Sequence, residues 1–223
     1  MGNSLKMARL DFFVMKSQLF TFLSLAPILL MFGLMGASAA LMGIHAAWYT
    51  ALLVACNIFA IQEKNGLDRL YGSVALKLED IVLGRYVFML LLYFASFIVA
   101  MAMHCGFALY RSHAPAAIDI LLGLGISFLA FSTIVSMQTP LYFKMGFIKG
   151  RAWSMLPFFA LMLMLLVPIA PHFVPALSSW TGAIERVQGN PPLLICLGLS
   201  AGCAMLLASY RLSVAAYRKR KRG

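Results

Sequence analysis

The chain of 223 residues is poor in charge and lacks the residue patterns on which most soluble sites depend. Only 11% of its residues are charged and 62% are hydrophobic, a composition that excludes an ordinary soluble globule. Its four cysteines form no C-x-x-C pair, and neither they nor its four histidines follow a ligand spacing. We therefore predict neither a disulfide framework nor a metal site.

Catalytic patterns are missing as well. No G-x-x-x-x-G-K-[ST] phosphate loop occurs, so the chain is not expected to hydrolyse ATP alone. The apolar segments contain neither paired carboxylates nor the Ser–His arrangement of an intramembrane protease. They also lack a central ionisable group, which ion-coupled carriers commonly use. The sequence predicts a non-catalytic membrane protein with no cofactor of its own, which would take energy for transport from another subunit.

What is present is a series of long apolar runs. They cover approximately residues 18–38, 43–62, 86–109, 117–140, 153–172 and 191–212. Each run has about the ~20 residues that an α-helix needs to cross the hydrocarbon core. We therefore predict an all-α integral membrane protein with six transmembrane helices, as a single transmembrane domain over residues 1–223.

The basic residues set the predicted orientation. Sixteen of the eighteen Lys and Arg residues lie before run one, between runs two and three, between runs four and five, and at the C-terminal end. Only Arg111 and Arg186 lie in the other three gaps. Because Lys and Arg resist translocation, the rich gaps are expected to be cytoplasmic, with both termini inside. This topology and anionic headgroups explain the net charge of +11, so no nucleic-acid partner is predicted.

Two segments outside the runs have their own predictions. Residues 1–17 mix apolar side chains such as Phe12 and Phe13 with Lys6 and Arg9, which indicates an interfacial helix in the cytoplasmic headgroup plane. A poorly ordered basic leader is the alternative. Residues 173–190 follow closely spaced prolines, which predicts an extracellular segment with a short interfacial helix.

Run four is the most polar run. Ser132 and Ser136 lie one helical turn apart, so their side chains share a face. They could line a translocation pathway, or they could bond neighbouring helices, and we favour the second interpretation. Gly198 and Gly202 in run six form a small-xxx-small pair, which permits close helix approach and is weak evidence for a dimer.

The loop at residues 63–85 is the largest segment expected to face the cytoplasm. Its apolar residues recur at three- and four-residue steps beside a charged face, which predicts an amphipathic helix under the membrane. Glu79 and Asp80 lie where a new helix would begin, since acids in a first turn complement the helix dipole. Such a helix could dock in a groove of a cytoplasmic partner. The alternative is an interfacial helix that only helps to fix the membrane topology.

Two motifs give a resemblance to a known family. Residues 80–86 read D-I-V-L-G-R-Y, and residues 140–151 read P-L-Y-F-K-M-G-F-I-K-G-R. With the span count, these segments resemble the ABC-2 type permeases, the small six-span membrane subunits of bacterial ABC exporters that include peptide-toxin exporters and lantibiotic-immunity permeases. The resemblance implies a multi-pass protein of the bacterial cytoplasmic (inner) membrane that exports an amphipathic or hydrophobic cargo, such as a peptide or lipid-like molecule.

The resemblance also implies partners and site residues. Two ABC ATPase subunits would bind ATP and Mg, and a second copy or a related permease would complete a homodimer or heterodimer. The ATPase-coupling residues that it implies are Glu63, Lys64, Leu67, Asp68, Arg69, Leu70, Tyr71, Lys144, Lys149 and Arg151. The rival interpretations are an integral-membrane enzyme and a non-transporting scaffold or immunity protein.

Overall fold

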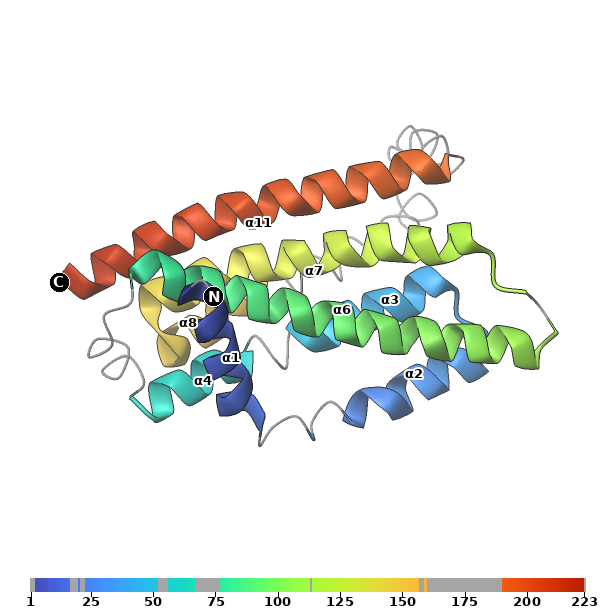
Figure 1. The fold of residues 1–223 in the computed structure, drawn as a ribbon, viewed down its shortest axis with the longest axis horizontal. Helices are drawn as coiled ribbons and strands as arrows, with labels where there is room; N and C mark the ends of the chain where they lie inside the picture. Colours follow the sequence, from blue (N-terminus) through green and yellow to red (C-terminus); the bar gives the residue numbers. More distant parts are fainter. Residues whose placement is uncertain are drawn as a thin grey trace.

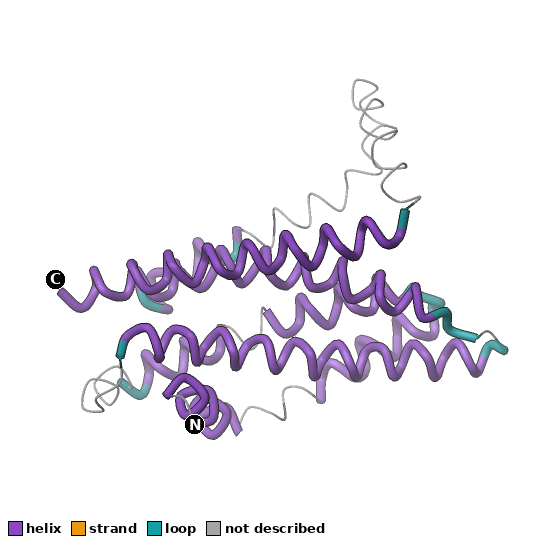
Figure 2. Tube along the Cα trace, turned by 45° about the horizontal axis from the view of Figure 1, so that its top comes forward, coloured by secondary structure: helices purple, strands orange, loops and turns teal. Residues whose placement is uncertain are grey.

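The computed structural model describes residues 3–16, 20, 23–51, 56–66, 77–112, 114–156, 159 and 190–222, and all its regular elements are helices (Figures 1 and 2). They are α1 (Asn3–Met15), α2 (Leu25–Leu34), α3 (Ala39–Tyr49), α4 (Cys56–Lys64), α6 (Leu78–Tyr110), α7 (Ala117–Met145), α8 (Phe147–Ser154) and α11 (Pro191–Arg222). The predicted all-α class is therefore confirmed for the described residues.

In the described part of the chain, three helices are long and apolar enough to cross a membrane. They are α6, α7 and α11, and they coincide with the third, fourth and sixth apolar runs. The three run lengthwise along the molecule (Figure 1), with α7 packed against both α11 and α3. Polar contacts and close backbone approach along these helices hold the bundle together.

The remaining runs give shorter or undescribed elements. Run one contains α2, whose ten residues extend ~15 Å, about half of the hydrocarbon thickness. Run two contains α3 and α4 as separate helices, with residues 52–55 outside the described part. Most of run five and of the predicted extracellular segment 173–190 also lies outside it. Six spans and cytoplasmic termini therefore stay predictions, although the described ends of α1 and α11 lie toward the same end of the bundle (Figure 1).

Helix α6 begins where the sequence predicts. Its first turn contains Glu79 and Asp80, directly after the extended residue Lys77. At its other end, the guanidinium of Arg111 donates to the carbonyl oxygens of Gly33 (3.0 Å) and Leu34 (2.5 Å). Because the last carbonyls of a helix lack partners inside the helix, these bonds satisfy the C-terminal end of α2.

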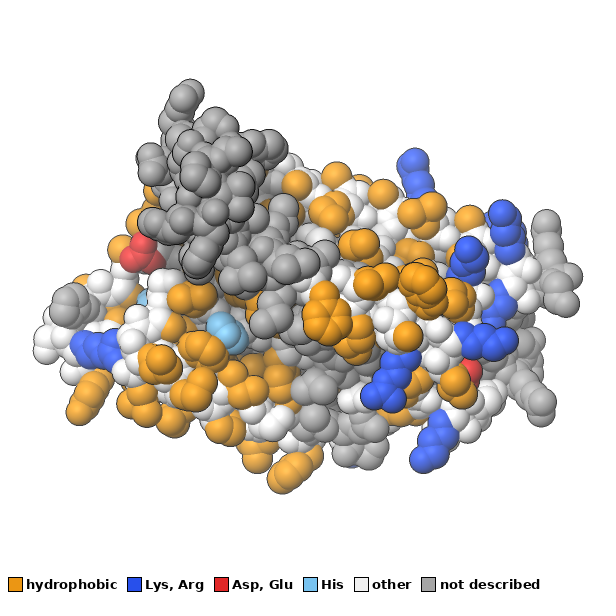
Figure 3. Space-filling model, turned by 180° about the vertical axis from the view of Figure 1, so that it is seen from behind, with side chains coloured by type: hydrophobic (Ala, Val, Ile, Leu, Met, Phe, Trp, Pro, Cys, Tyr) orange, Lys and Arg blue, Asp and Glu red, His pale blue; other side chains and the backbone are white. Residues whose placement is uncertain are grey.

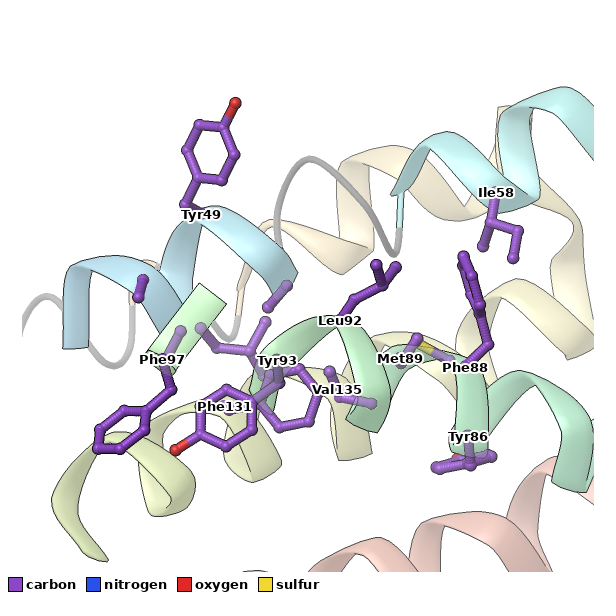
Figure 4. Close-up of a cluster of buried hydrophobic side chains, with 14 of the residues drawn as sticks. Tyr49, Ile58, Tyr86, Phe88, Met89, Leu92, Tyr93, Phe97, Phe131 and Val135 are labelled. Atoms are coloured by element: carbon purple, nitrogen blue, oxygen red, sulfur yellow. The ribbon is translucent and has the colours of Figure 1, made fainter. Parts of the chain in front are cut away.

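Aromatic side chains fill the space between α6 and α7. The ring of Tyr93 stacks on that of Phe131, with ring centres 4.6 Å apart, and Phe97 lies beside them (Figure 4). The Tyr93 hydroxyl also bonds the Ser127 hydroxyl at 2.8 Å, so its polar end is satisfied inside the bundle. This cluster fixes α7 against α6 by both packing and hydrogen bonding.

Helices α7 and α11 approach each other through glycine. A Cβ atom added to Gly198 would lie 2.4 Å from the carbonyl oxygen of Gly125, and one added to Gly202 would lie 2.7 Å from the Phe128 ring. The small-xxx-small pair is thus used within this chain, where it lets the two backbones come together.

We expect Gly198→Ala to destabilise the fold and Gly106→Ala to leave it as stable or slightly more so. Both changes improve helix propensity by up to ~1 kcal/mol. At Gly198 the new methyl group overlaps backbone, which costs about 1–3 kcal/mol, whereas no heavy atom lies within 4 Å of one at Gly106. Thermal unfolding in detergent measures the difference. Equal melting temperatures for the two variants would contradict the close approach of α7 and α11.

Candidate functional site

The described parts of the two loops singled out by the sequence, residues 63–66 and 140–151, lie together at one end of the bundle. This end comprises α1, α4, α8 and the last turns of α11, and exposed Lys and Arg side chains gather around it (Figure 3), so we call it the basic end. The carboxylate of Glu63 in α4 accepts hydrogen bonds from the backbone N–H groups of Phe147 and Ile148, the latter at 3.1 Å. An acid at this place satisfies N–H groups that the helix leaves unpaired and complements its dipole.

The turn between α7 and α8 makes this bond possible. Gly146 has a φ of +78°, a left-handed conformation that favours glycine, and it ends α7 and precedes α8. A Cβ atom at Gly146 would lie 3.2 Å from a carboxylate oxygen of Glu63. The glycine therefore provides both the sharp turn and the room for the carboxylate.

Helix α8 is also fixed to α7 through Ser154. The Tyr142 hydroxyl donates to the Ser154 hydroxyl at 2.6 Å, and the Gln138 amide donates to the Ser154 carbonyl oxygen at 2.8 Å. The Ser154 hydroxyl in turn donates to the carbonyl oxygen of Arg151 at 2.7 Å. Contacts at both of its ends thus hold α8 in one orientation.

The structure places the predicted coupling residues unequally. Lys64 is exposed at the end of α4, Lys144 is exposed in the last turn of α7, and Lys149 and Arg151 are exposed on α8. Glu63 differs from these four residues because its carboxylate bonds the backbone of the second loop, at Phe147 and Ile148. The remaining five residues lie outside the described part of the chain: Leu67, Asp68, Arg69, Leu70 and Tyr71.

An aromatic cluster lies beneath these loops. The ring of Phe59 in α4 contacts those of Tyr142 and Phe143 in α7, at centre distances of 4.9 and 5.2 Å. Phe143 contacts Tyr217 in α11 at 5.1 Å. The guanidinium of Arg85 in α6 lies over the ring of Phe59, 4.9 Å from its centre. The cluster therefore joins four helices.

A buried ion pair attaches α1 to the same junction. The Arg85 Nε atom lies 3.1 Å from a carboxylate oxygen of Asp11, and each side chain is only 1% exposed. Burial raises the pKa of Asp11 to about 6, although the attraction of Arg85 opposes this shift. The loss of hydration thus outweighs the Coulomb attraction, so the pair fixes the position of α1 more than it stabilises the fold.

Sequence reasoning missed the role of this pair. It assigned Asp11 to a mixed interfacial helix, and it used Arg85 for the topology and as part of the D-I-V-L-G-R-Y motif. One signal was present: Asp11 is the only acidic residue before Glu63. Asp11 is a lone acid among basic and apolar residues, and Arg85 directly precedes the apolar run 86–109. Such a pattern favours pairing between the two side chains over exposure of each to solvent.

The pathway residues lie within the bundle. Ser132 is fully buried, and a Cβ atom at Gly202 of α11 would lie 2.9 Å from its hydroxyl oxygen. The Ser136 hydroxyl donates to the carbonyl oxygen of Thr133 at 3.1 Å. In this arrangement both serines belong to the contact between α7 and α11, and a pathway role for them stays a prediction.

We expect Asp11→Leu to cost about 3–5 kcal/mol of stability, because it leaves a buried guanidinium without its carboxylate. The double variant Asp11→Leu/Arg85→Met is expected to regain most of this loss, since it removes both charges and keeps apolar volume. Thermal unfolding of the two variants and the native chain measures these effects. A double variant as unstable as the single one would contradict the pairing.

The same ion pair has a pH signature. The pKa of Asp11 rises from 3.8 to about 6 on folding, so the folded chain binds more protons than the unfolded chain in this interval. The neutral carboxyl, whose oxygen can still accept a hydrogen bond from Arg85, is therefore the form that folding favours. This part of the stability is fully present below pH 3.8 and is lost as the pH rises through about 6. The double variant lacks this dependence, which unfolding at several pH values tests.

Comparison with known families gives the class of protein. A family model described as ABC-2 family transporter protein matches residues 6–218, a range that includes α6, α7, α8 and the whole described junction at the basic end. No curated protein and no solved structure matches the chain. With its long apolar helices, the match confirms the resemblance noted from the two loop motifs: this chain belongs to the ABC-2 family of transporter proteins, as a multi-pass membrane permease of an ABC transporter.

Proposed function

We propose that this permease is the membrane subunit of an ATP-driven exporter and that a separate ATPase subunit drives it through the basic end. The observation that carries the proposal is the bond from the Glu63 carboxylate to the first N–H groups of α8. It connects the two loops that a cytoplasmic partner would reach, so a force on either loop acts on both.

The contacts of α8 suggest how motion would travel. Displacement of α8 by an ATPase would act on α4 through Glu63 and on α7 through Ser154 and its two donors. Lys144, Lys149 and Arg151 are exposed beside these contacts and are the proposed points of attachment on the second loop. On the first loop, Lys64 and the segment Leu67–Tyr71 are proposed to complete the coupling surface.

The assembly that we propose has two permeases and two ATPase subunits, which bind ATP and Mg, in a bacterial cytoplasmic membrane. The permease partner would be a second copy or a related chain. The apolar character of the spans suits an amphipathic or hydrophobic cargo, a peptide or lipid-like molecule, because the described spans contain no charge near their centres. An apolar pathway would release such a cargo without a strong binding site.

The direct test is purification of the tagged chain from its native membranes in mild detergent, followed by mass spectrometry. We expect a stoichiometric protein with a phosphate loop, whose ATP hydrolysis rises when the permease is added back in lipid. A chain that purifies with no ATPase across several detergents, or that itself turns over a substrate, would contradict the proposal.

Within the reconstituted complex, we expect Glu63→Gln to lower the stimulation of ATP hydrolysis about tenfold. The amide has one acceptor oxygen and no charge, so it bonds the N–H groups of Phe147 and Ile148 more weakly. Asp119→Asn is the matched control, because Asp119 is an exposed acid in the first turn of α7, far from the basic end. Normal stimulation by Glu63→Gln would show that this bond does not carry the coupling.

A further inference from the structure

We propose that the last turns of α11 form an additional docking surface for the ATPase, which would present an acidic patch to them. This surface comprises Arg218, Lys219 and Arg220, and it lies beside the two coupling loops. The inference rests on the proposed function, but its residues are outside the segments that the sequence assigned to coupling.

The length of α11 places these residues beyond the membrane. From Pro191 to Leu212 the helix extends ~33 Å, enough to cross a hydrocarbon core of ~30 Å. The headgroup region adds only ~5–8 Å on each side. Because the helix continues unbroken to Arg222, Arg218 and Arg220 lie ~9–12 Å past Leu212 along its axis. They therefore project past the headgroups into the aqueous phase.

Helix α6 gives an independent measure of the same depth. Its apolar run begins at Tyr86, and Glu79 lies about 10 Å before it along the helix. Arg218 reaches Glu79 with an N–O distance of 3.1 Å, although both side chains remain about half exposed. The distances along α6 and along α11, which run in opposite directions, therefore both place the Arg218–Glu79 pair beyond the apolar part of the bundle.

The end of α11 is held against the protein. Ser213 is fully buried and bonds the Tyr86 hydroxyl at 2.9 Å, and Tyr217, only 1% exposed, packs on Phe143. These contacts alternate with the exposed basic positions along the helix, so one face is anchored and the other is presented to solvent. A helix anchored in this way does not lie flat in the headgroup plane, which argues for a protein partner and against lipid.

The surface continues into the proposed coupling site. Arg220 lines the small cavity between Glu63, Gly146 and Phe147, at the start of α8. Two exposed basic residues of α8, Lys149 and Arg151, follow shortly after Phe147. Lys64, which is also exposed, directly follows Glu63 in α4. Three of the described acids at this end have partners: Asp11 pairs with Arg85, Glu63 bonds α8, and Glu79 pairs with Arg218 and partly offsets its charge. Because Lys149, Arg151 and Lys219 are exposed as well, the exposed charge is predominantly positive, which is complementary to an acidic surface.

The test uses the full chain in nanodiscs of neutral phosphatidylcholine and the ATPase subunit that co-purifies with it, expressed separately. The variant Arg218→Gln/Lys219→Gln/Arg220→Gln keeps good helix formers and removes three charges. Its control is Lys6→Gln/Arg9→Gln/Lys16→Gln, which removes three exposed charges from α1 and the residue after it. These residues also lie at the basic end but belong to neither the two proposed coupling loops nor α11, so the control separates loss of local contacts from loss of overall positive charge. A second variant, Lys219→Glu, reverses one exposed charge. Unfolding temperatures verify that each variant is folded.

We expect the α11 variant to bind the ATPase about tenfold more weakly at low salt, because each exposed charge pair contributes a fraction of a tenfold change. This difference should shrink as salt rises and screening shortens to ~8 Å. Lys219→Glu should also weaken binding, and the control variant should bind as the native chain does.

Three results would overturn the inference. Native affinity and salt dependence in the α11 variant would show that the surface is not used. A defect that appears only in nanodiscs with anionic phosphatidylglycerol would assign these residues to lipid headgroups. If even the native chain bound no ATPase, the proposed function would fail and this inference with it, whereas the first two results leave the proposed function intact.

Discussion

The arrangement of the basic end depends on a single buried cation. Arg85 lies at the start of the apolar part of α6, and its side chain is only 1% exposed. A buried guanidinium requires a carboxylate and dense packing nearby. Asp11 supplies the first from α1, and the Phe59 ring supplies part of the second from α4. One residue therefore determines where two sequence-distant segments attach to a membrane-spanning helix.

The remaining contacts at this end follow from that attachment. Phe59 brings α4 against Tyr142 and Phe143 of α7, and Phe143 in turn contacts Tyr217 of α11. With α4 in this place, Glu63 reaches the N-terminus of α8. The ion pair is costly in hydration, yet it gives a unique register to helices whose apolar faces could otherwise slide over one another.

The sequence predicts much of this fold, for physical reasons that also explain what it leaves out. Apolar length and basic residues predict α6, α7 and α11, because hydrocarbon thickness and translocation act on each segment independently. Acids and motifs predict the start of α6 and single out Glu63, Lys149 and Arg151, whose coupling role stays a prediction. The Glu63–α8 bond, the Asp11–Arg85 pair and the Gly198–Gly125 contact depend on helix rotation and on long-range packing, which no local pattern specifies. Likewise, Ser209 bonds Tyr86 in α6 and a carbonyl oxygen of α7, a partnership that spacing alone does not reveal.

The polar contacts inside the bundle bear on how a permease of this kind would change shape. Tyr86 bonds Ser209 and Ser213, and Ser209 donates to the carbonyl oxygen of Ser136, so hydroxyl groups join α6, α7 and α11 near the ends of their apolar runs at the basic end. The glycine contact between α7 and α11 adds backbone-to-backbone packing that tolerates little sliding. Separating these helices would leave buried hydroxyl groups without these partners, at a cost of about 1–3 kcal/mol for each group left unsatisfied. Under the proposed function, we therefore expect these three helices to move as one rigid body, with the cargo passing along their outer faces between two permease chains.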